Sequence, residues 1–429
     1  MSRRFWLPTV LGLILFSFSS AGSQQEDPGS SGFANLVLQY LDSTDSDESD
    51  RLLRAIQSHP ETSVERVTRA IQTERSYPSQ PIGVLPDERI TIHGRAYSFS
   101  LSIPLTYQPS KGYGLVVCLH GAGFTGEAYL ERWQARLGDE YILACPTYPA
   151  GAWFTRRAED LVLATIQQVR RRYHVDPDRV FLTGMSNGGI GAWLIGMHYA
   201  PHFAGLAPMA SGLDNVLMPF LANLRDTPIY IIHGAKDRVM PVELSRTIAR
   251  ELTALGYPYV YREHEREHPM AGGHYFPREE LPDLVAWFNR QRREPFPSRL
   301  TLVRDASHFQ PFGWVRIDAT DPIAAFSDDL VDKRDERIKR REYARLDASI
   351  AGPNRIEVST ERVRRFSLFL NDRLIDASRP VTVVTNGRLS FSGTVTPSVE
   401  TLLRQARLRQ DPRQLFAIHL ALSVEPSPS

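Results

Sequence analysis

The sequence predicts an α/β fold built on a doubly wound, mainly parallel sheet, with a short helical segment before it and a β-rich domain after it. Three observations predict this class. Apolar runs typical of buried strands alternate with helical stretches between residues 85 and 294. Loops containing glycine and polar residues follow several of these runs. Beyond residue 294 the pattern changes to short strand-like runs divided by turns.

Residues 1–23 are predicted to be a signal peptide. Arg3 and Arg4 form a basic start, residues 5–18 are apolar but too few to span a membrane, and the small residues 21–23 suit cleavage. The sequence thus predicts a secreted or periplasmic protein with no stable membrane span after signal cleavage.

Residues 24–84 are predicted to form a helical segment and a linker. Apolar residues recur at helical spacing in three stretches, 34–41, 48–57 and 63–73. Three prolines in residues 77–86 indicate a linker. We expect this segment to pack against the side of the core rather than to cap a substrate cleft.

The predicted catalytic domain, residues 85–294, opens with a hairpin at the sheet edge. Alternating runs at 89–92 and 97–103 meet at His93-Gly94. Further strands are predicted near residues 115–119, 141–145, 180–184, 205–210, 228–232 and 259–263. Helices are predicted to include residues 158–173, 242–255 and 281–290.

The six residues 184–189, Gly-Met-Ser-Asn-Gly-Gly, follow the apolar run 180–183 and precede a helical pattern. A strand, a sharp turn and a helix with a serine at the apex form a nucleophile elbow, whose flanking positions must lack bulky side chains. Gly184 and Gly188 meet that demand. Ser186 is therefore the predicted nucleophile.

Candidate partners for Ser186 follow in the chain order that such an elbow requires. Asp237 lies in the loop after a predicted strand, where a carboxylate can orient a histidine. His274 follows two glycines that can bring its ring over the serine, and it is the predicted base. His268 is the reserve candidate for the base, and Asp214 is the alternative acid.

These residue types suit nucleophilic catalysis. A serine hydroxyl is a weak nucleophile at neutral pH, so a histidine must take its proton, and an aspartate orients that histidine and stabilises its charged form. The oxyanion formed in the attack needs backbone N–H donors. The predicted donors are Asn187, directly after the serine, and Ala122, in the glycine-containing loop 120–123 after a strand.

The motifs at residues 120–123, 184–189 and 233–237 together resemble those of the alpha/beta-hydrolase superfamily, over about residues 85–294. The branches they resemble are carboxylesterases and phospholipases, polyhydroxybutyrate-depolymerase or feruloyl-esterase-like enzymes, and prolyl-oligopeptidase-like enzymes. The resemblance implies the roles given above to the serine, the aspartate and the two donors. It leaves the substrate open, because these branches differ in their loops.

Composition and charge limit the classes of function. The net charge of +1 at pH 7 gives no electrostatic basis for binding nucleic acid. No metal and no cofactor are predicted, because the sequence lacks paired cysteines and the His-Glu-x-x-His spacing. Cys118 and Cys145 fall in predicted buried strands, where a disulfide between them is not favoured. His120 and His233, each before a glycine at a strand end, are expected to be structural.

Residues 295–429 are predicted to form a β-rich, sandwich-like accessory domain after a linker at 294–297. Its role is expected to be binding of a polymer or carbohydrate, or stabilisation of the core. The charged stretch 328–345 is interpreted as a solvated face. Strands are predicted at residues 300–304, 312–317, 355–359, 364–370, 381–385 and 388–391, the last two joined by the turn Asn386-Gly387.

The leading hypothesis is a secreted serine hydrolase that cleaves small-molecule or polymeric carboxylic esters through an acyl-enzyme. The first alternative is a serine peptidase of prolyl-oligopeptidase type, since an amide differs from an ester in its leaving group. Residues 24–84 are too few for the propeller that such peptidases often carry. The second alternative is a non-catalytic binding protein on a hydrolase scaffold, which the predicted nucleophile, acid, histidine and oxyanion loop together disfavour.

Overall fold

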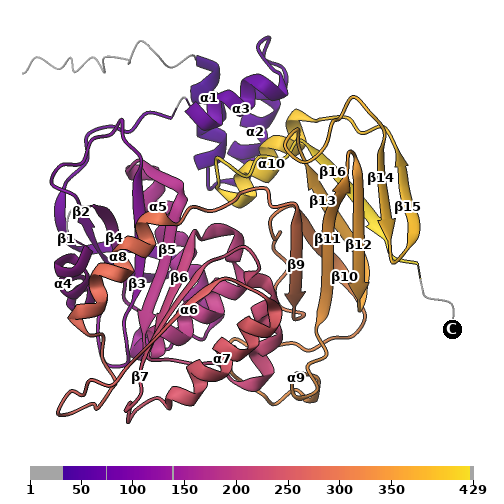
Figure 1. Ribbon diagram of the computed structural model, residues 1–429. Coiled ribbons are helices and arrows are strands. Elements are labelled where there is room, and N and C mark those ends of the chain that lie inside the picture. The colour runs from indigo at the N-terminus through magenta and orange to yellow at the C-terminus, as the bar shows by residue number, and fades with distance from the viewer. Residues whose placement is uncertain (1–31, 74, 138–139, 426–429) are drawn as a thin grey trace, which may run out of the picture.

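The computed structural model describes residues 32–73, 75–137 and 140–425. The predicted signal peptide, residues 1–23, lies outside them. Figure 1 shows three parts: a group of N-terminal helices, a large sheet flanked by helices, and layered strands towards the C-terminus. Within the described ranges, no helix is both long and apolar enough to cross a membrane.

The large sheet contains eight strands, namely β1 (Gly83–Ile92), β2 (Arg95–Ile103), β3 (Tyr113–Leu119), β4 (Tyr141–Pro146), β5 (Val175–Met185), β6 (Gly205–Met209), β7 (Ile229–Gly234) and β8 (Tyr259–His264). Their order is β1-β2-β4-β3-β5-β6-β7-β8. The predicted hairpin pairs β1 with β2, and β2 also runs antiparallel to β4. The other neighbours are parallel, which confirms the predicted fold class.

Helices cover both faces of this sheet. They are α4 (Gly126–Leu137), α5 (Arg156–Arg172), α6 (Asn187–His198), α7 (Val242–Leu255) and α8 (Leu281–Arg290). Every residue of β3 is buried, as expected for an inner parallel strand. Leu115 and Val117 belong to the apolar cluster with α5, α6 and α7, whereas Val116 and Cys118 belong to the cluster with α4 and α8. Cys118 and Cys145 are buried free thiols.

The N-terminal segment forms three helices, α1 (Gly32–Asp42), α2 (Ser46–Gln57) and α3 (Val64–Thr73). Their apolar faces pack with α10 (Val399–Arg409) in a cluster separate from the two that flank the large sheet. Figure 1 shows these four helices together at one end of the molecule. The segment is thus held by a helix that lies near the other end of the chain.

The predicted linker at residues 77–86 is shorter in the structure, because β1 already begins at Gly83. Pro86 lies where the pairing of β1 with β2 is irregular, between Leu85 and Glu88. Proline has no N–H to offer a neighbouring strand, so it is tolerated at such an irregularity on an edge strand.

The C-terminal region contains two further sheets. Their strands are β9 (Arg299–Arg304), β10 (Val315–Thr320), β11 (Ala344–Gly352), β12 (Arg355–Glu361), β13 (Val363–Leu370), β14 (Val381–Thr385), β15 (Arg388–Gly393) and β16 (Ile418–Ser423). One sheet has the order β15-β14-β12-β11-β9 and the other β10-β13-β16. The strands β11 and β16 and the helix α10 were not predicted, and the stretch 328–345 includes a short helix, α9 (Glu336–Lys339).

The C-terminal sheets share one apolar cluster with the catalytic region. Asn223 fixes the contact between the two, because its amide nitrogen donates to the carbonyls of Met197 and Val303, and its oxygen accepts from the Val303 amide at 2.7 Å. The core of the molecule is therefore continuous across residue 294.

Candidate active site

Ser186 lies at the sharp turn between β5 and α6. Its backbone has φ 59° and ψ −124°, a conformation that side-chain-bearing residues rarely adopt. A Cβ at Gly184 would lie 2.3 Å from the Gly188 oxygen, and one at Gly188 would lie 2.0 Å from the Leu119 oxygen. Both contacts are far inside van der Waals distance, so the turn can form only with glycine at these two positions.

The two predicted oxyanion donors flank the serine. Asn187 is the first residue of α6, so its amide has no acceptor within the helix. Ala122 follows β3 in a loop that reaches Ser186: a Cβ built on the neighbouring Gly121 would lie 3.7 Å from the Ser186 Cβ. In the described part of the chain, the Ala122 amide has no hydrogen-bond acceptor. Both N–H groups are therefore free to serve a ligand at the serine.

Asp237 and His274 meet in the loops after β7 and β8. The Nδ1 of His274 lies 2.7 Å from the Asp237 Oδ2, and the other carboxylate oxygen accepts the amides of Val239 and Met240, each at 2.8 Å. Burial alone would raise the pKa of the Asp237 carboxyl, but hydrogen bonds from His233, His274 and these amides hold it well below its ordinary value. Asp237 is therefore an ionised, fixed partner for the His274 ring.

His233 contacts Asp237 beneath the site, in the structural role expected of it, although the sequence did not specify the carboxylate as its partner. Its Nε2 lies 3.2 Å from the Asp237 Oδ2 and 2.9 Å from the Met240 oxygen, while its Nδ1 lies 2.7 Å from the Ser245 hydroxyl. The His-Gly sequence at the end of β7 was the available signal. His233 thus has a positioning role beneath the carboxylate.

The loops that carry Asp237 and His274 touch through glycine. The Gly273 amide donates to the Lys236 oxygen at 2.9 Å, and a Cβ at Gly234 would lie 2.2 Å from the Gly273 oxygen. This approach of two backbones is what brings His274 to the carboxylate, and it needs small residues at both positions.

The reserve candidates lie elsewhere. His268 makes backbone contacts within its own turn, and its Nδ1 accepts the Met270 amide at 3.3 Å. Asp214 accepts the Val216 amide at 3.1 Å and pairs with Lys333 of the C-terminal region. The structure therefore brings Asp237 together with His274 and leaves both reserve residues in other contacts.

His120 is structural and holds the loop after β3. The Nδ1 of His120 lies 2.9 Å from the Gly121 oxygen, and its Nε2 accepts the Tyr148 amide, so the ring holds the loop after β3.

Among the described residues, the Ser186 hydroxyl has no hydrogen bond, including to His274. A catalytic hydrogen bond of this kind often tightens only when substrate is bound.

Metal-binding side chains come together away from this site. Sequence spacing indicated no metal cluster, yet Glu159, His198 and His308 offer ligand atoms that all lie within 4.8 Å of one another. They come from α5, the end of α6 and the C-terminal region, so no local motif could reveal them.

The chain is similar in part to proteins named as esterases and serine hydrolases. No protein-family model matches the chain. The chain is 29% identical to acyl-protein thioesterase 1 of Gibberella zeae over 121 residues, which is 27% of this chain and 49% of the relative. It is 27% identical to a probable feruloyl esterase C of Aspergillus flavus over 168 residues, which is 36% of this chain and 60% of the relative. It thus spans about half to three fifths of the length of these curated relatives.

Solved structures that resemble the chain include a thermostable esterase, with 23% identity and a TM-score of 0.42, covering 49% of this chain and 63% of the other. A fluorophosphonate-binding serine hydrolase of Staphylococcus aureus has 13% identity and a TM-score of 0.41, covering 49% of this chain and 99% of the other.

Proposed function

We propose that this chain is an alpha/beta hydrolase that cleaves carboxylic esters with Ser186 as its nucleophile. One observation carries the proposal: a serine with φ 59° projects from a glycine-flanked turn at the same sheet edge as the Asp237–His274 pair. A strained backbone conformation of this kind costs free energy, and it persists where function requires it.

The proposed reaction has two steps. In the first, His274 takes the Ser186 proton while the serine oxygen attacks the ester carbonyl, and the oxyanion accepts the amides of Asn187 and Ala122. Collapse of this intermediate transfers the proton to the leaving alcohol and leaves an acyl-enzyme. In the second, water attacks the acyl group with His274 again as base, which releases the acid and restores the serine.

Exposed apolar side chains in the site loops favour an apolar or aromatic substrate group. Phe124, two residues after the donor Ala122, is 41% exposed, and Val239, next but one to Asp237, is 57% exposed. Met270, in the loop before His274, is 91% exposed. The names of the curated relatives, a thioesterase and a probable feruloyl esterase, add an acyl thioester and a feruloyl ester to the substrates worth testing.

Export remains part of the proposal. It rests on the basic start, the apolar stretch and the small residues within 1–23, which lie outside the described residues. N-terminal sequencing of the chain recovered from the periplasm or medium of an expressing cell tests it, because export predicts a mature N-terminus near Gln24.

A panel of rates tests the activity. It contains short and long p-nitrophenyl esters, a feruloyl ester, an acyl thioester, and peptide anilides with and without proline before the scissile bond. We expect ester hydrolysis that falls by about 10⁶ in Ser186→Ala. Hydrolysis of anilides alone would instead indicate a peptidase, and silence on every substrate would indicate a binding protein.

A pair of histidine variants tests the assignment of the base. His274→Ala should lower kcat by at least about 10³, because the serine loses its proton acceptor. His268→Ala is the matched control from the same loop and should retain nearly full activity. The reverse ranking of the two variants would assign the base to His268.

A further inference from the structure

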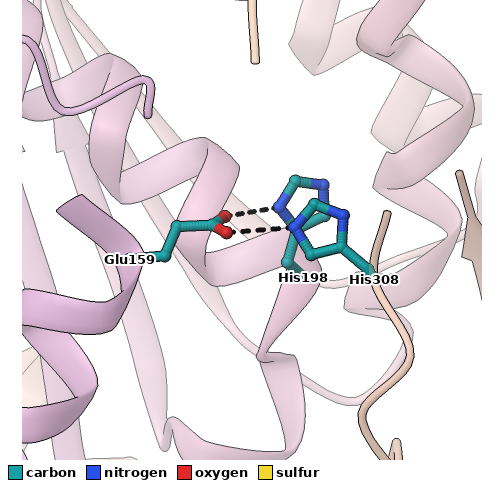
Figure 2. Close-up of side chains that lie close together, drawn as sticks. All are labelled: Glu159, His198 and His308. Atoms are coloured by element: carbon teal, nitrogen blue, oxygen red, sulfur yellow. Dashed lines mark hydrogen bonds and ion pairs between the residues drawn. The ribbon is translucent and has the colours of Figure 1, made fainter. Parts of the chain in front are cut away.

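A buried carboxylate joins two imidazoles at the contact between the catalytic and C-terminal regions. Figure 2 shows Glu159 facing His198 and His308 with one carboxylate oxygen to each. The Nδ1 of His198 lies 2.6 Å from the Glu159 Oε1, and the Nε2 of His308 lies 3.0 Å from the Oε2. The two rings lie close together, with centroids 3.9 Å apart and planes tilted by 33°.

This donor set is one that transition metals favour. Imidazole nitrogen and carboxylate oxygen are ligands for Zn²⁺ and neighbouring divalent ions, and Glu159, His198 and His308 each offer one ligand atom, all within 4.8 Å of one another. The present contacts have hydrogen-bond lengths. An ion in place of the shared protons needs donor atoms about 3.3 Å apart, from metal–ligand distances near 2.1 Å, so the rings would move by less than about 1 Å.

A second carboxylate orients one of the rings. The Nδ1 of His308 lies 2.6 Å from the Asp305 Oδ1, which fixes the ring so that its Nε2 faces Glu159. Asp305 is itself held, because it accepts the Phe326 amide at 3.1 Å and the Ser307 hydroxyl. A carboxylate behind a ligating histidine is the usual outer partner in metal sites, where it sets the tautomer and raises the basicity of the ligand.

Burial and charge supply an independent argument. The side chains of Glu159 and Asp305 are 2% and 0% exposed, and those of His198 and His308 are 3% and 6% exposed. Within the described ranges, the ion pairs of both carboxylates are with these histidines, and the nearby Arg304 donates to the His308 carbonyl instead. Both nitrogens of His308 face carboxylate oxygens, so without an ion the ring carries a proton on each nitrogen and the group has a charge of −1. An ion in place of the Nε2 proton leaves neutral imidazoles and a charge of −2, which a divalent cation balances.

The second nitrogen of His198 is also unusual. Its Nε2 is buried and has no hydrogen-bond partner in the described part of the chain. The polar contact of the ring there is the one between its Nδ1 and Glu159. A buried ring nitrogen without a partner costs free energy, and a stronger bond at the ring's other polar contact would offset it.

We propose that Glu159, His198 and His308 bind one divalent transition-metal ion, with Zn²⁺ the best match, and that this ion ties the C-terminal region to the catalytic region. Its role is structural. His198 ends α6 and Ser186 precedes its first residue, so a twelve-residue helix separates the two, about 18 Å at 1.5 Å per residue. An ion here fixes the far end of the helix that carries the nucleophile at its start.

Metal content of the full chain tests the proposal without any variant. The protein is unfolded in the presence of a chelator, refolded without metal and titrated with ZnCl₂. Bound zinc is measured by inductively coupled plasma mass spectrometry. We expect about one zinc per chain and a Tm at least about 3 °C higher than that of the metal-free protein. Co²⁺ in place of Zn²⁺ should give the visible absorption bands of a tetrahedral site.

Variants then assign the ligands. His308→Gln and Glu159→Gln should lose both the zinc and the zinc-dependent rise in Tm. His93→Gln is the matched control, because His93 also pairs with a carboxylate, Asp160 at 3.0 Å, but is 71% exposed; it should retain both. A wild-type chain with no zinc, no shift of Tm and no Co²⁺ bands would overturn the proposal and leave a hydrogen-bonded cluster. Zinc content that stays unchanged in both His308→Gln and Glu159→Gln would also overturn the proposal.

Discussion

At the scale of the residue, the Asp237 carboxylate shows how a fully buried charge is kept ionised. Its side chain is 0% exposed, yet two imidazoles and two backbone amides surround its oxygens. Such contacts recover the free energy that the carboxylate loses on leaving water. The same contacts fix its direction, so the His274 ring has one orientation available.

Replacement of this carboxylate by an amide tests its role. Asp237→Asn keeps the shape but removes the charge that stabilises a protonated His274, so kcat should fall by about 10³ to 10⁴. Asp214→Asn changes the carboxylate of the alternative acid, which pairs with Lys333, and should alter kcat less than about threefold. Measurement of kcat for both variants, with Tm as a check on folding, shows which aspartate acts with His274. A larger loss in Asp214→Asn would contradict the assignment.

At the scale of the element, the turn between β5 and α6 depends on two close backbone approaches. The Leu119 oxygen at the end of β3 occupies the space that a side chain at Gly188 would need. Strand, turn and helix can therefore hold the serine only while residue 188 has no side chain.

Gly188→Ala should lower the free energy of unfolding by about 3 kcal/mol or more and remove activity, because its Cβ would lie 2.0 Å from a carbonyl oxygen of an inner strand. Gly352→Ala, at the end of β11, is the control, since nothing lies within 4 Å of its Cβ. Its stability should change by less than about 1 kcal/mol. Urea unfolding measures both, and equal stabilities would refute the steric argument.

The elements that the sequence did not predict are those whose partners lie far away in the chain. The helix α10 buries Leu402, Leu403 and Ala406 between arginines, and its apolar neighbours are the N-terminal helices. The strand β11 begins in the charged stretch 328–345, and β9 and β12 on either side stabilise it. By contrast, the inner parallel strands were predictable because their own residues are apolar on both faces.

At the scale of the whole molecule, a buried ion network holds the catalytic and C-terminal regions together. The guanidinium of Arg293, 3% exposed, pairs with Asp178 at 2.8 Å and with Asp411 at 2.5 Å. Burial alone would raise the pKa of Asp411, but Arg293 and Arg170 hold it well below its ordinary value. Arg293 lies directly before the predicted linker, so its contacts fix the junction.

Arg293→Met should therefore lower the free energy of unfolding by about 3 to 5 kcal/mol, because it leaves two carboxylates buried with one cation fewer. The neighbouring Arg292→Met is the control: its side chain is 63% exposed and pairs with Asp176, so the loss should stay below about 1 kcal/mol. Chemical denaturation of the two variants compares them. Equal losses would show that the network does not hold the regions together.

The side-chain clusters of the molecule differ in how far the sequence predicts them. Ser186 and its glycines form a local motif, and the strand order places Asp237 and the histidine loops at the same edge. Which histidine meets Asp237 depends on how two loops pack through glycine, and the glycine pair before His274 was the local signal that favoured it. The grouping of Glu159 with His198 and His308 depends on docking of the C-terminal region and was not predictable at all.

Covalent labelling with a fluorophosphonate reagent tests the central claim that Ser186 is an activated nucleophile. Intact-mass measurement and peptide mapping of the wild-type chain should find one adduct, on Ser186, and Ser186→Ala should take up none. Labelling should also slow greatly in His274→Ala. An unlabelled wild-type chain, or an adduct that maps to another residue and persists in Ser186→Ala, would contradict the account.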